Sequence, residues 1–417
     1  MSELTDWLAR PIPRTFPYTT VLGQVRQVGK HFTDETTLKQ LALARETLLR
    51  LETAGPPEES VRQLQHFLDV LLDKWDGCYD YRSYTALALL QLPGIEDAPE
   101  EPELSLARRD RLVAALLADA LGFELAAEEG RSRLLPEMRP GADLVAKRYR
   151  LGLRVATPTL ERLGLRAAAA RATAARTSEE LAEAVKTMHE EIRAELSPLE
   201  TRMLQLSLVP VYVSHDEYLF LRVLQVFETT FAMLVVQLRS AVDALRDVRW
   251  QDAAGHVAVA ARVLTESAPV FSLLATMQVE SFRTFREFTE GASAIQSRNY
   301  KLLESLCRIP DEERLDSAAY RSAPEVRDRV RAGQQTLEDA YRATLGPGPE
   351  VPSGAEDAVR ALRDFGAALR RWRQTHYRLA VRMLGTRSGT GYTEGTPYLS
   401  EVRKIPVFTA PELGDEG

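Results

Sequence analysis

The chain has 417 residues, a formal net charge of -7 and a hydrophobic content of 45%, values typical of a globular protein with one large domain or a few ordinary ones. No apolar run approaches the roughly 20 residues of a membrane span, and the first residues lack a signal-peptide pattern, so we expect a cytoplasmic protein without a membrane partner. The negative charge argues against nucleic acid as a partner. Cys78 and Cys307 lack disulfide or metal-ligand spacing and are expected to be reduced thiols in or near the core.

Helical periodicity runs through almost the whole chain, so the sequence predicts an all-α fold. The first half is expected to form an antiparallel helix pair over 37–51 and 60–74 and a further helix over 81–90. An acidic, proline-bearing linker at 94–103 leads to amphipathic helices at 105–127 and 177–196, the second opened by a capping box at Thr177. One stretch, 206–213, alternates like a strand, but Pro210 interrupts it.

The second half begins with His215-Asp216-Glu217, followed by a long helix with a wide aromatic stripe and another helix over 253–277. Phe220 and Leu224, four residues apart, are expected to share one face of the long helix. A glycine- and proline-rich loop at 346–354 precedes a last helix that ends at Gly385, because glycine favours helix C-termini.

Arg286 lies in a phenylalanine-rich helical segment. A guanidinium keeps its charge, so among aromatic rings it needs an anionic partner. That partner is either a glutamate of the chain, such as Glu287 or Glu290, or the carboxylate of a substrate. Ser293 follows in a turn of small residues, where a ligand could approach the backbone.

His376 lies on the apolar face of the last helix, and Thr390 follows it by fourteen positions in a glycine-rich loop. The histidine is either a hydrogen-bonded core residue or an axial ligand of haem iron, since a neutral ring nitrogen in a dry slot suits that metal. Three nearby arginines form either a solvated helix face or a surface for haem propionates: Arg370, Arg371 and Arg373.

Four segments, in order along the chain, resemble the tryptophan 2,3-dioxygenase family of haem-dependent aromatic amino acid oxygenases. They are YDYRSYTALALLQLP (79–93), HDEYLFLRVLQVFETTF (215–231), FREFTEGASAIQS (285–297), and WRQTH through GTGYTEGTPYL (372–399). The family's fold is a haem-binding bundle of helices, here with extra helices inserted. The resemblance divides the chain into an N-terminal region with the tyrosine helix (1–93), an inserted helical region (94–213) and the haem-binding core (214–417).

The resemblance also implies roles for individual residues. His376 would be the proximal ligand of the iron of haem b, with Trp372, Ser293 and Leu224 against the haem. The substrate would contact Arg286 through its carboxylate, Thr390 through its amino acid moiety and Phe220 through its ring. Two tyrosines, Tyr81 and Tyr84, and Ser293 would complete the substrate pocket; in the family this tyrosine helix enters a neighbouring subunit, which implies a homo-oligomer, either a dimer or a tetramer.

The implied activity is dioxygenation of tryptophan or a close relative, with O2 as co-substrate, opening the indole C2-C3 bond to an N-formylkynurenine-type product. The chain departs from the family at Leu224, where a distal histidine is expected, in its bulkier loop at 389–395 and in its long insertion. Leucine cannot accept a hydrogen bond from the indole N–H. An alternative is therefore a monooxygenase or hydroxylase of an aromatic amino acid in specialised metabolism, using oxygen or peroxide. A third is a non-catalytic haem protein, against which the pairing of Arg286 with Thr390 argues.

Overall fold

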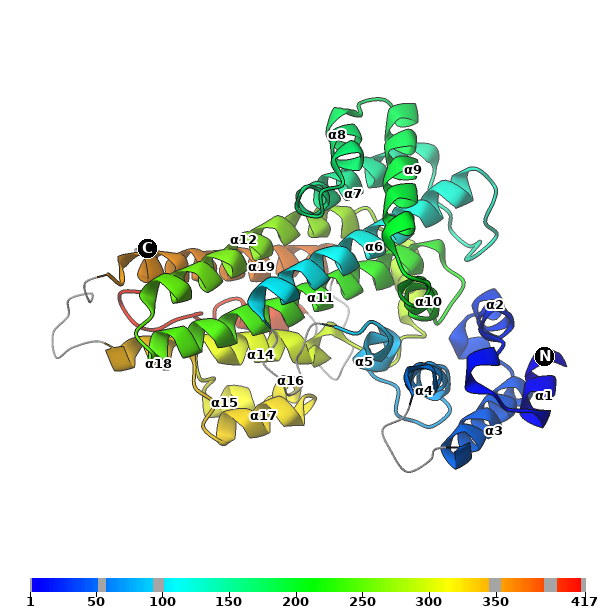
Figure 1. Cartoon of the computed structure of the whole chain (residues 1–417), viewed down its shortest axis with the longest axis horizontal. Coiled ribbons are helices and arrows are strands. Elements are labelled where there is room, and N and C mark those ends of the chain that lie inside the picture. Colours follow the sequence, from blue (N-terminus) through cyan, green and yellow to red (C-terminus); the bar gives the residue numbers. More distant parts are fainter. Residues whose placement is uncertain (1, 52–57, 93–100, 345–353, 386–395, 414–417) are drawn as a thin grey trace.

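The computed structural model describes residues 2–51, 58–92, 101–344, 354–385 and 396–413, and within these ranges it contains helices and no strand. Three long helices form the centre of the molecule and run side by side in Figure 1: α11 (His215–Arg246), α12 (Trp250–Leu274) and α19 (Glu356–Leu384). The all-α fold class predicted from the sequence is confirmed.

The N-terminal helices pack around a small apolar core of their own. They are α1 (Ser2–Ala9), α2 (Tyr18–Val28), α3 (Glu35–Leu51) and α4 (Glu59–Leu72). The expected helix over 81–90 is wrong in its length, because α5 (Tyr81–Tyr84) ends after one turn. Ala86 then takes a left-handed backbone conformation with φ of 51°, which an α-helix does not tolerate. A short 3₁₀ turn, Leu87–Leu89, follows.

Residues 101–213, the described part of the expected insertion, form five helices: α6 (Pro102–Glu128), α7 (Ala142–Arg162), α8 (Arg166–Ala174), α9 (Ser178–Glu195) and α10 (Pro198–Leu206). Of these, α7, α8 and α9 lie above the long helices in Figure 1, whereas α6 runs beside α11 through the centre. The capping box at Thr177 is present, with its hydroxyl accepting from the backbone of Glu180. Apolar residues of α6, α7 and α9 belong to the same buried cluster as those of α11, α12 and α19. The insertion therefore shares one core with the rest of the bundle.

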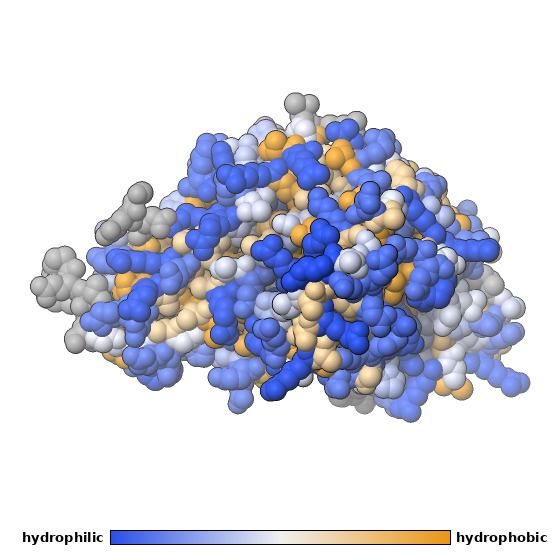
Figure 2. Space-filling view, turned by 90° about the horizontal axis from the view of Figure 1, so that it is seen from above, coloured by the Kyte–Doolittle hydropathy of each residue, from blue (hydrophilic) through white to orange (hydrophobic). Residues whose placement is uncertain are grey.

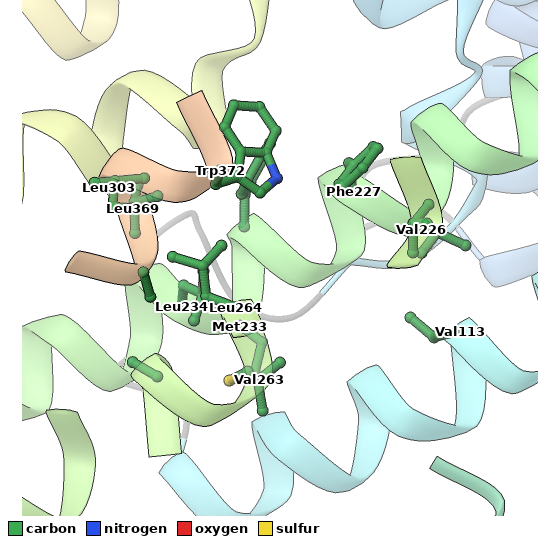
Figure 3. Close-up of a cluster of buried hydrophobic side chains, with 14 of the residues drawn as sticks. Val113, Val226, Phe227, Met233, Leu234, Val263, Leu264, Leu303, Leu369 and Trp372 are labelled. Atoms are coloured by element: carbon green, nitrogen blue, oxygen red, sulfur yellow. The ribbon is translucent and has the colours of Figure 1, made fainter. Parts of the chain in front are cut away.

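The remaining helices surround the long ones. They are α13 (Val279–Arg286), α14 (Arg298–Cys307), α15 (Glu312–Leu315), α16 (Ala318–Arg321), α17 (Pro324–Arg331), α18 (Leu337–Thr344) and α20 (Thr396–Val402). In the central core, Trp372 of α19 packs edge-on against Phe227 of α11, with ring centroids 5.6 Å apart, and Figure 3 shows both within the apolar cluster. The end of α19 is as expected, because Gly385 takes a positive φ of 62° there.

The surface is mainly polar, with apolar side chains scattered among charged ones on the face seen in Figure 2. By length and hydropathy alone α11 and α12 could cross a membrane, but 94% of the apolar window of α11 is buried inside the protein, as in core helices of soluble proteins. Of the cysteines, Cys307 is buried as expected, whereas the expectation for Cys78 is wrong, because its side chain is exposed.

Candidate haem and substrate site

A cavity of about 230 Å³ lies between the long helices and the helices that surround them. Its walls come from α5, α11, α12, α13, α14, α19 and α20, elements that are up to three hundred residues apart in the sequence. A cavity of this kind at the junction of helices is where a bundle holds a ligand or cofactor.

The cavity brings together eight of the site residues predicted from the sequence. These are Tyr81, Tyr84, Phe220, Leu224, Arg286, Ser293, Trp372 and His376. Thr390 lies outside the described residues. Their assignment to haem or substrate stays a prediction, but four segments distant in sequence converge on a single space.

His376 faces this cavity from α19. Protein atoms surround its ring, yet the side chain is only half-buried because part of it borders the cavity. The ring lies beside Phe271, nearly parallel to it at 6.0 Å between centroids, and beside Trp372 at 5.3 Å. Burial lowers the pKa of the imidazole to about 4, so the ring is neutral at pH 7. In the described part of the chain no hydrogen bond engages its nitrogens, and the core alternative of a hydrogen-bonded histidine therefore lacks its partner.

Basic side chains outnumber acidic ones in the cavity wall. Among the described lining residues the cations are Arg286, Lys301, Arg314, Arg373 and Arg403, and the one carboxylate is Glu228. Behind the wall, Glu304 accepts from Arg314 at 3.0 Å and from Arg373 at 3.4 Å. Burial raises the pKa of Glu304, but these two guanidinium groups hold it below its usual value. The basic side chains of this wall can bind ligands that carry carboxylates.

The arginine run of α19 divides between surface and interior. Arg371 is exposed, whereas Arg373 is 4% exposed and donates to the hydroxyl of Tyr300 at 2.8 Å and to the carbonyl of Ile405 at 2.7 Å. The sequence suggested a basic surface here. It did not indicate that Arg373 points inward, nor that Lys301 and Arg314 join it, because only the folded chain brings α14, α15 and α19 to one cavity.

Arg286 ends α13 and is half-buried at the cavity. Glu290, one of its two candidate partners within the chain, forms an ion pair with Lys74 at 3.2 Å and lies 3.3 Å from Nδ1 of His31. Lys74 also donates to the carbonyl of Phe288 at 2.8 Å. These contacts fix the turn after Arg286 against the N-terminal helices.

The tyrosine helix enters the cavity of its own chain. The backbone N–H of Tyr81 donates to Gln296 Oε1 at 3.0 Å, and the hydroxyl of Tyr84 donates to Glu217 Oε1 at 3.2 Å. Both tyrosines are at most 3% exposed. Within a single chain, the two tyrosines, Arg286 and His376 therefore border the same space.

The residues His215, Asp216 and Glu217 hold this arrangement together but do not line the cavity. His215 Nε2 lies 3.0 Å from Glu124 Oε2, and Asp216 forms an ion pair with Arg148 at 2.6 Å. Glu217 accepts from the backbone N–H groups of Val211 and Tyr212. The sequence motif thus anchors α6, α7 and the tyrosine helix to the start of α11.

Comparison with known proteins agrees with this geometry. The family model of tryptophan 2,3-dioxygenase matches residues 199–339, which include α11 and the Arg286–Ser293 segment. The tryptophan 2,3-dioxygenase of Burkholderia lata is 26% identical over 239 residues, which cover 49% of this chain and 76% of the relative. That of Bordetella pertussis is also 26% identical over 239 residues, 49% of this chain and 83% of the relative. These matches support membership of the tryptophan 2,3-dioxygenase family.

Membership confirms the expected enzyme class, a haem-dependent oxidoreductase, at the level of the family. The matched stretch 199–339 contains neither the tyrosine helix nor His376. For these the geometry supplies the argument, because both lie on the cavity that the matched helices α11, α13 and α14 form. On α11, apolar Leu224 lines the cavity at the position where the family resemblance led us to expect a histidine.

The residues fit a haem group. The neutral imidazole of His376 borders the cavity without a hydrogen-bond partner among the described residues, and aromatic rings pack beside it. Arg314 and Arg373 line the same cavity and could bind the haem propionates. Beside His376, Nε1 of Trp372 is buried without a partner among the described residues, so a polar atom at the same wall is also available.

Proposed function

We propose that this chain is a haem-dependent oxygenase of an aromatic amino acid, and that it dioxygenates tryptophan or a close relative at the indole C2-C3 bond. One observation carries the proposal: neutral, unpartnered His376, the guanidinium of Arg286 and a wall of aromatic rings border a single cavity. An iron ligand, a carboxylate partner and a surface for a flat ring are the three elements that such an enzyme requires.

His376 would hold the iron, with Phe271 and Trp372 packed against its ring. When bound, haem supplies a ferrous iron that binds and activates oxygen. Lys301, Arg314 and Arg373 would face the propionates, since all three line the cavity and Arg314 and Arg373 share one carboxylate, that of Glu304.

The substrate would be held at both ends. Arg286 would bind its carboxylate with two parallel hydrogen bonds, which fixes orientation as well as position. Phe220 contacts Phe285 and Phe282 at 5.3 and 5.7 Å between centroids, and Tyr84 at 6.4 Å, so a flat ring would meet a wall of aromatic faces and edges. The apolar wall excludes water from the reacting carbon atoms.

Leu224 favours the second candidate, monooxygenation or hydroxylation of an aromatic amino acid. A leucine neither takes nor gives a proton, so it cannot orient an indole through its N–H. Dioxygenation places both atoms of O2 in the product and needs no external reductant. Monooxygenation places one oxygen atom in the product and requires either a reductant with O2 or a peroxide, whose second oxygen leaves as water.

Labelled oxygen separates the two candidates. The ferrous holoprotein is incubated with tryptophan and ¹⁸O2, and the product is analysed by mass spectrometry and by N-formylkynurenine absorbance. Two labelled atoms in a ring-opened product support dioxygenation. One labelled atom, or turnover only with added peroxide, supports the monooxygenase, and a chain that neither binds haem nor turns over any aromatic amino acid contradicts both.

A further inference from the structure

One face of α11 carries a carboxylate in an otherwise apolar stripe. Phe220, Leu224 and Glu228 are spaced by four residues, so their side chains follow one another along the helix, and all three line the cavity. Glu228 lies one turn beyond Leu224, the position at which the chain lacks a polar group. It is also the one carboxylate among the described residues of the cavity wall.

The hydrogen bonding of Glu228 is incomplete. Its side chain is 1% exposed, and Oε2 accepts from the amide of Asn299 at 2.9 Å. Oε1 is buried and has no hydrogen-bond partner in the part of the chain that the structure describes. A buried carboxylate oxygen without a donor is costly, so native proteins rarely leave one without a water or a ligand.

Lys301 does not fill this role. Burial lowers the pKa of its amine to about 7, and its Nζ donates to the backbone carbonyl of Ile295. No ion pair within 4.0 Å joins Lys301 to Glu228 in the described residues, although their charges attract through space. Lys301 therefore leaves Oε1 of Glu228, a residue of the cavity wall, without a donor.

Tyr81 of α5 borders the same cavity and lies close to Glu228. Its ring is 3% exposed and borders the cavity, and its hydroxyl and that of Ser297 lie near enough to stabilise the charged form of Glu228. Burial, and then the charge of Glu228, raise the pKa of Tyr81 well above its usual value, so the phenol keeps its proton. The polar side chains of Glu228, Tyr81 and Ser297 thus lie together in a cavity wall that is otherwise mainly apolar near Leu224.

We propose that Glu228 determines which ring this enzyme accepts, by taking a hydrogen bond at Oε1 from an N–H or O–H donor on the ring of the bound aromatic amino acid. This inference rests on the proposed function, since the ring reaches α11 only if the amino acid end is held near Arg286. Glu228 would then favour substrates that carry a hydrogen-bond donor on the ring, which Leu224 cannot do because its side chain has no acceptor. The substrate class is then an aromatic amino acid with a hydrogen-bond donor on its ring.

Matched ligand pairs test the inference on the unaltered ferric holoprotein. Tryptophan is compared with 3-(3-benzothienyl)alanine, in which sulfur replaces the N–H, and tyrosine with phenylalanine. Dissociation constants are measured from the ligand-induced shift of the haem spectrum. At pH 8, above the pKa of about 7 to which burial raises Glu228, we expect the donor-bearing member of at least one pair to bind about 10- to 100-fold more tightly, the range for a hydrogen bond to a charged group.

Variants then show whether Glu228 causes the difference in affinity within a ligand pair. Glu228→Met removes the acceptor at similar volume and should bring the ratio of the two dissociation constants within a pair close to one. Glu228→Gln keeps an acceptor oxygen and should retain most of the difference in affinity. Glu179→Met, the same change at an exposed glutamate of α9 outside the cavity wall, is the control and should leave the ratio of the two dissociation constants unchanged. A ratio unchanged in Glu228→Met would overturn the assignment.

The outcomes distinguish this inference from the function on which it rests. If aromatic amino acids bind but the members of each pair bind equally, the inference is wrong and the proposed function stands. If no aromatic amino acid shifts the haem spectrum, both are wrong. Since the ligand pairs are measured on the unaltered protein, misfolding of a variant does not remove the test.

Discussion

Replacing Arg148 tests how the insertion is held to the bundle. Arg148 of α7 is fully buried, and its guanidinium lies 2.6 Å from Glu124 of α6 and 2.6 Å from Asp216 of α11. Arg148→Met keeps most of the volume but leaves two buried carboxylates without their cation. Breaking a buried pair in this way costs about 3 to 5 kcal/mol. That loss corresponds to a fall in Tm of about 3 to 6 °C for a chain of 417 residues.

The assay is thermal unfolding of the haem-free protein, followed by circular dichroism. Arg150→Met is a matched control on the exposed face of the same helix and should change stability by no more than about 0.5 kcal/mol. Adding Glu124→Gln and Asp216→Asn to Arg148→Met should recover much of the loss, because no charge is then left unpaired. Equal Tm values for the Arg148 and Arg150 variants would refute the reasoning.

Three further predictions concern the cavity. Arg286→Ala should weaken amino acid binding about 10- to 100-fold with haem loading unchanged, and Arg286→Lys should weaken it less; unchanged affinity would contradict the carboxylate role. Mixing the Tyr84→Ala and Arg286→Ala proteins should restore no activity, because one chain supplies both side chains to one cavity; recovered activity would show exchange between subunits. Burial raises the pKa of Glu228 to about 7 and lowers that of Lys301 to about 7. Native Glu228 thus retains a proton that the unfolded chain releases, so its contribution to stability should fall between about pH 4.5 and 7, and the Tm difference between unaltered protein and Glu228→Gln should show it. The Lys301 contribution should rise from about pH 7 to 10.5, because the unfolded chain holds that proton longer. A Glu228→Gln difference that does not vary with pH would contradict this.

The elements that sequence reasoning predicted are those with local signals. The apolar periodicity of α11 and α19, the capping box at Thr177 and the glycine that ends α19 all act within a few residues, and the structure contains each of them. The convergence of the predicted site residues on one cavity was reached through resemblance of motifs, since periodicity alone does not bring α5, α13 and α19 together.

The segment 206–213 shows what local signals miss. Its alternation resembles a strand, yet its backbone groups bond elsewhere: the N–H groups of Val211 and Tyr212 donate to Glu217, and the carbonyls of Pro210 and Val211 accept from Lys30 and His31. These partners come from a helix start and from a turn some 180 residues away. The local alternation of residues cannot predict these distant hydrogen-bond partners.

Polar groups inside the cavity were missed for a related reason. Glu228 and Lys301 occupy helical positions that read as ordinary amphipathic spacing, and Arg148 lies on α7, a helix that the sequence reasoning did not single out. Their significance depends on burial and on which charges face them across helices. An unpartnered Oε1 on Glu228 becomes visible only when α11, α14 and the tyrosine helix are placed together.

Haem binding through His376 is the central claim, and one spectrum tests it most directly. The purified chain is titrated with haem, and its Soret band is compared with those of His376→Ala and of His256→Ala, a half-buried histidine that contacts Gln237 and does not line the cavity. We expect the unaltered and His256→Ala proteins to give the same band, and His376→Ala to lose or shift it until free imidazole is added. A His376→Ala protein with the affinity and spectrum of the unaltered chain would contradict the account.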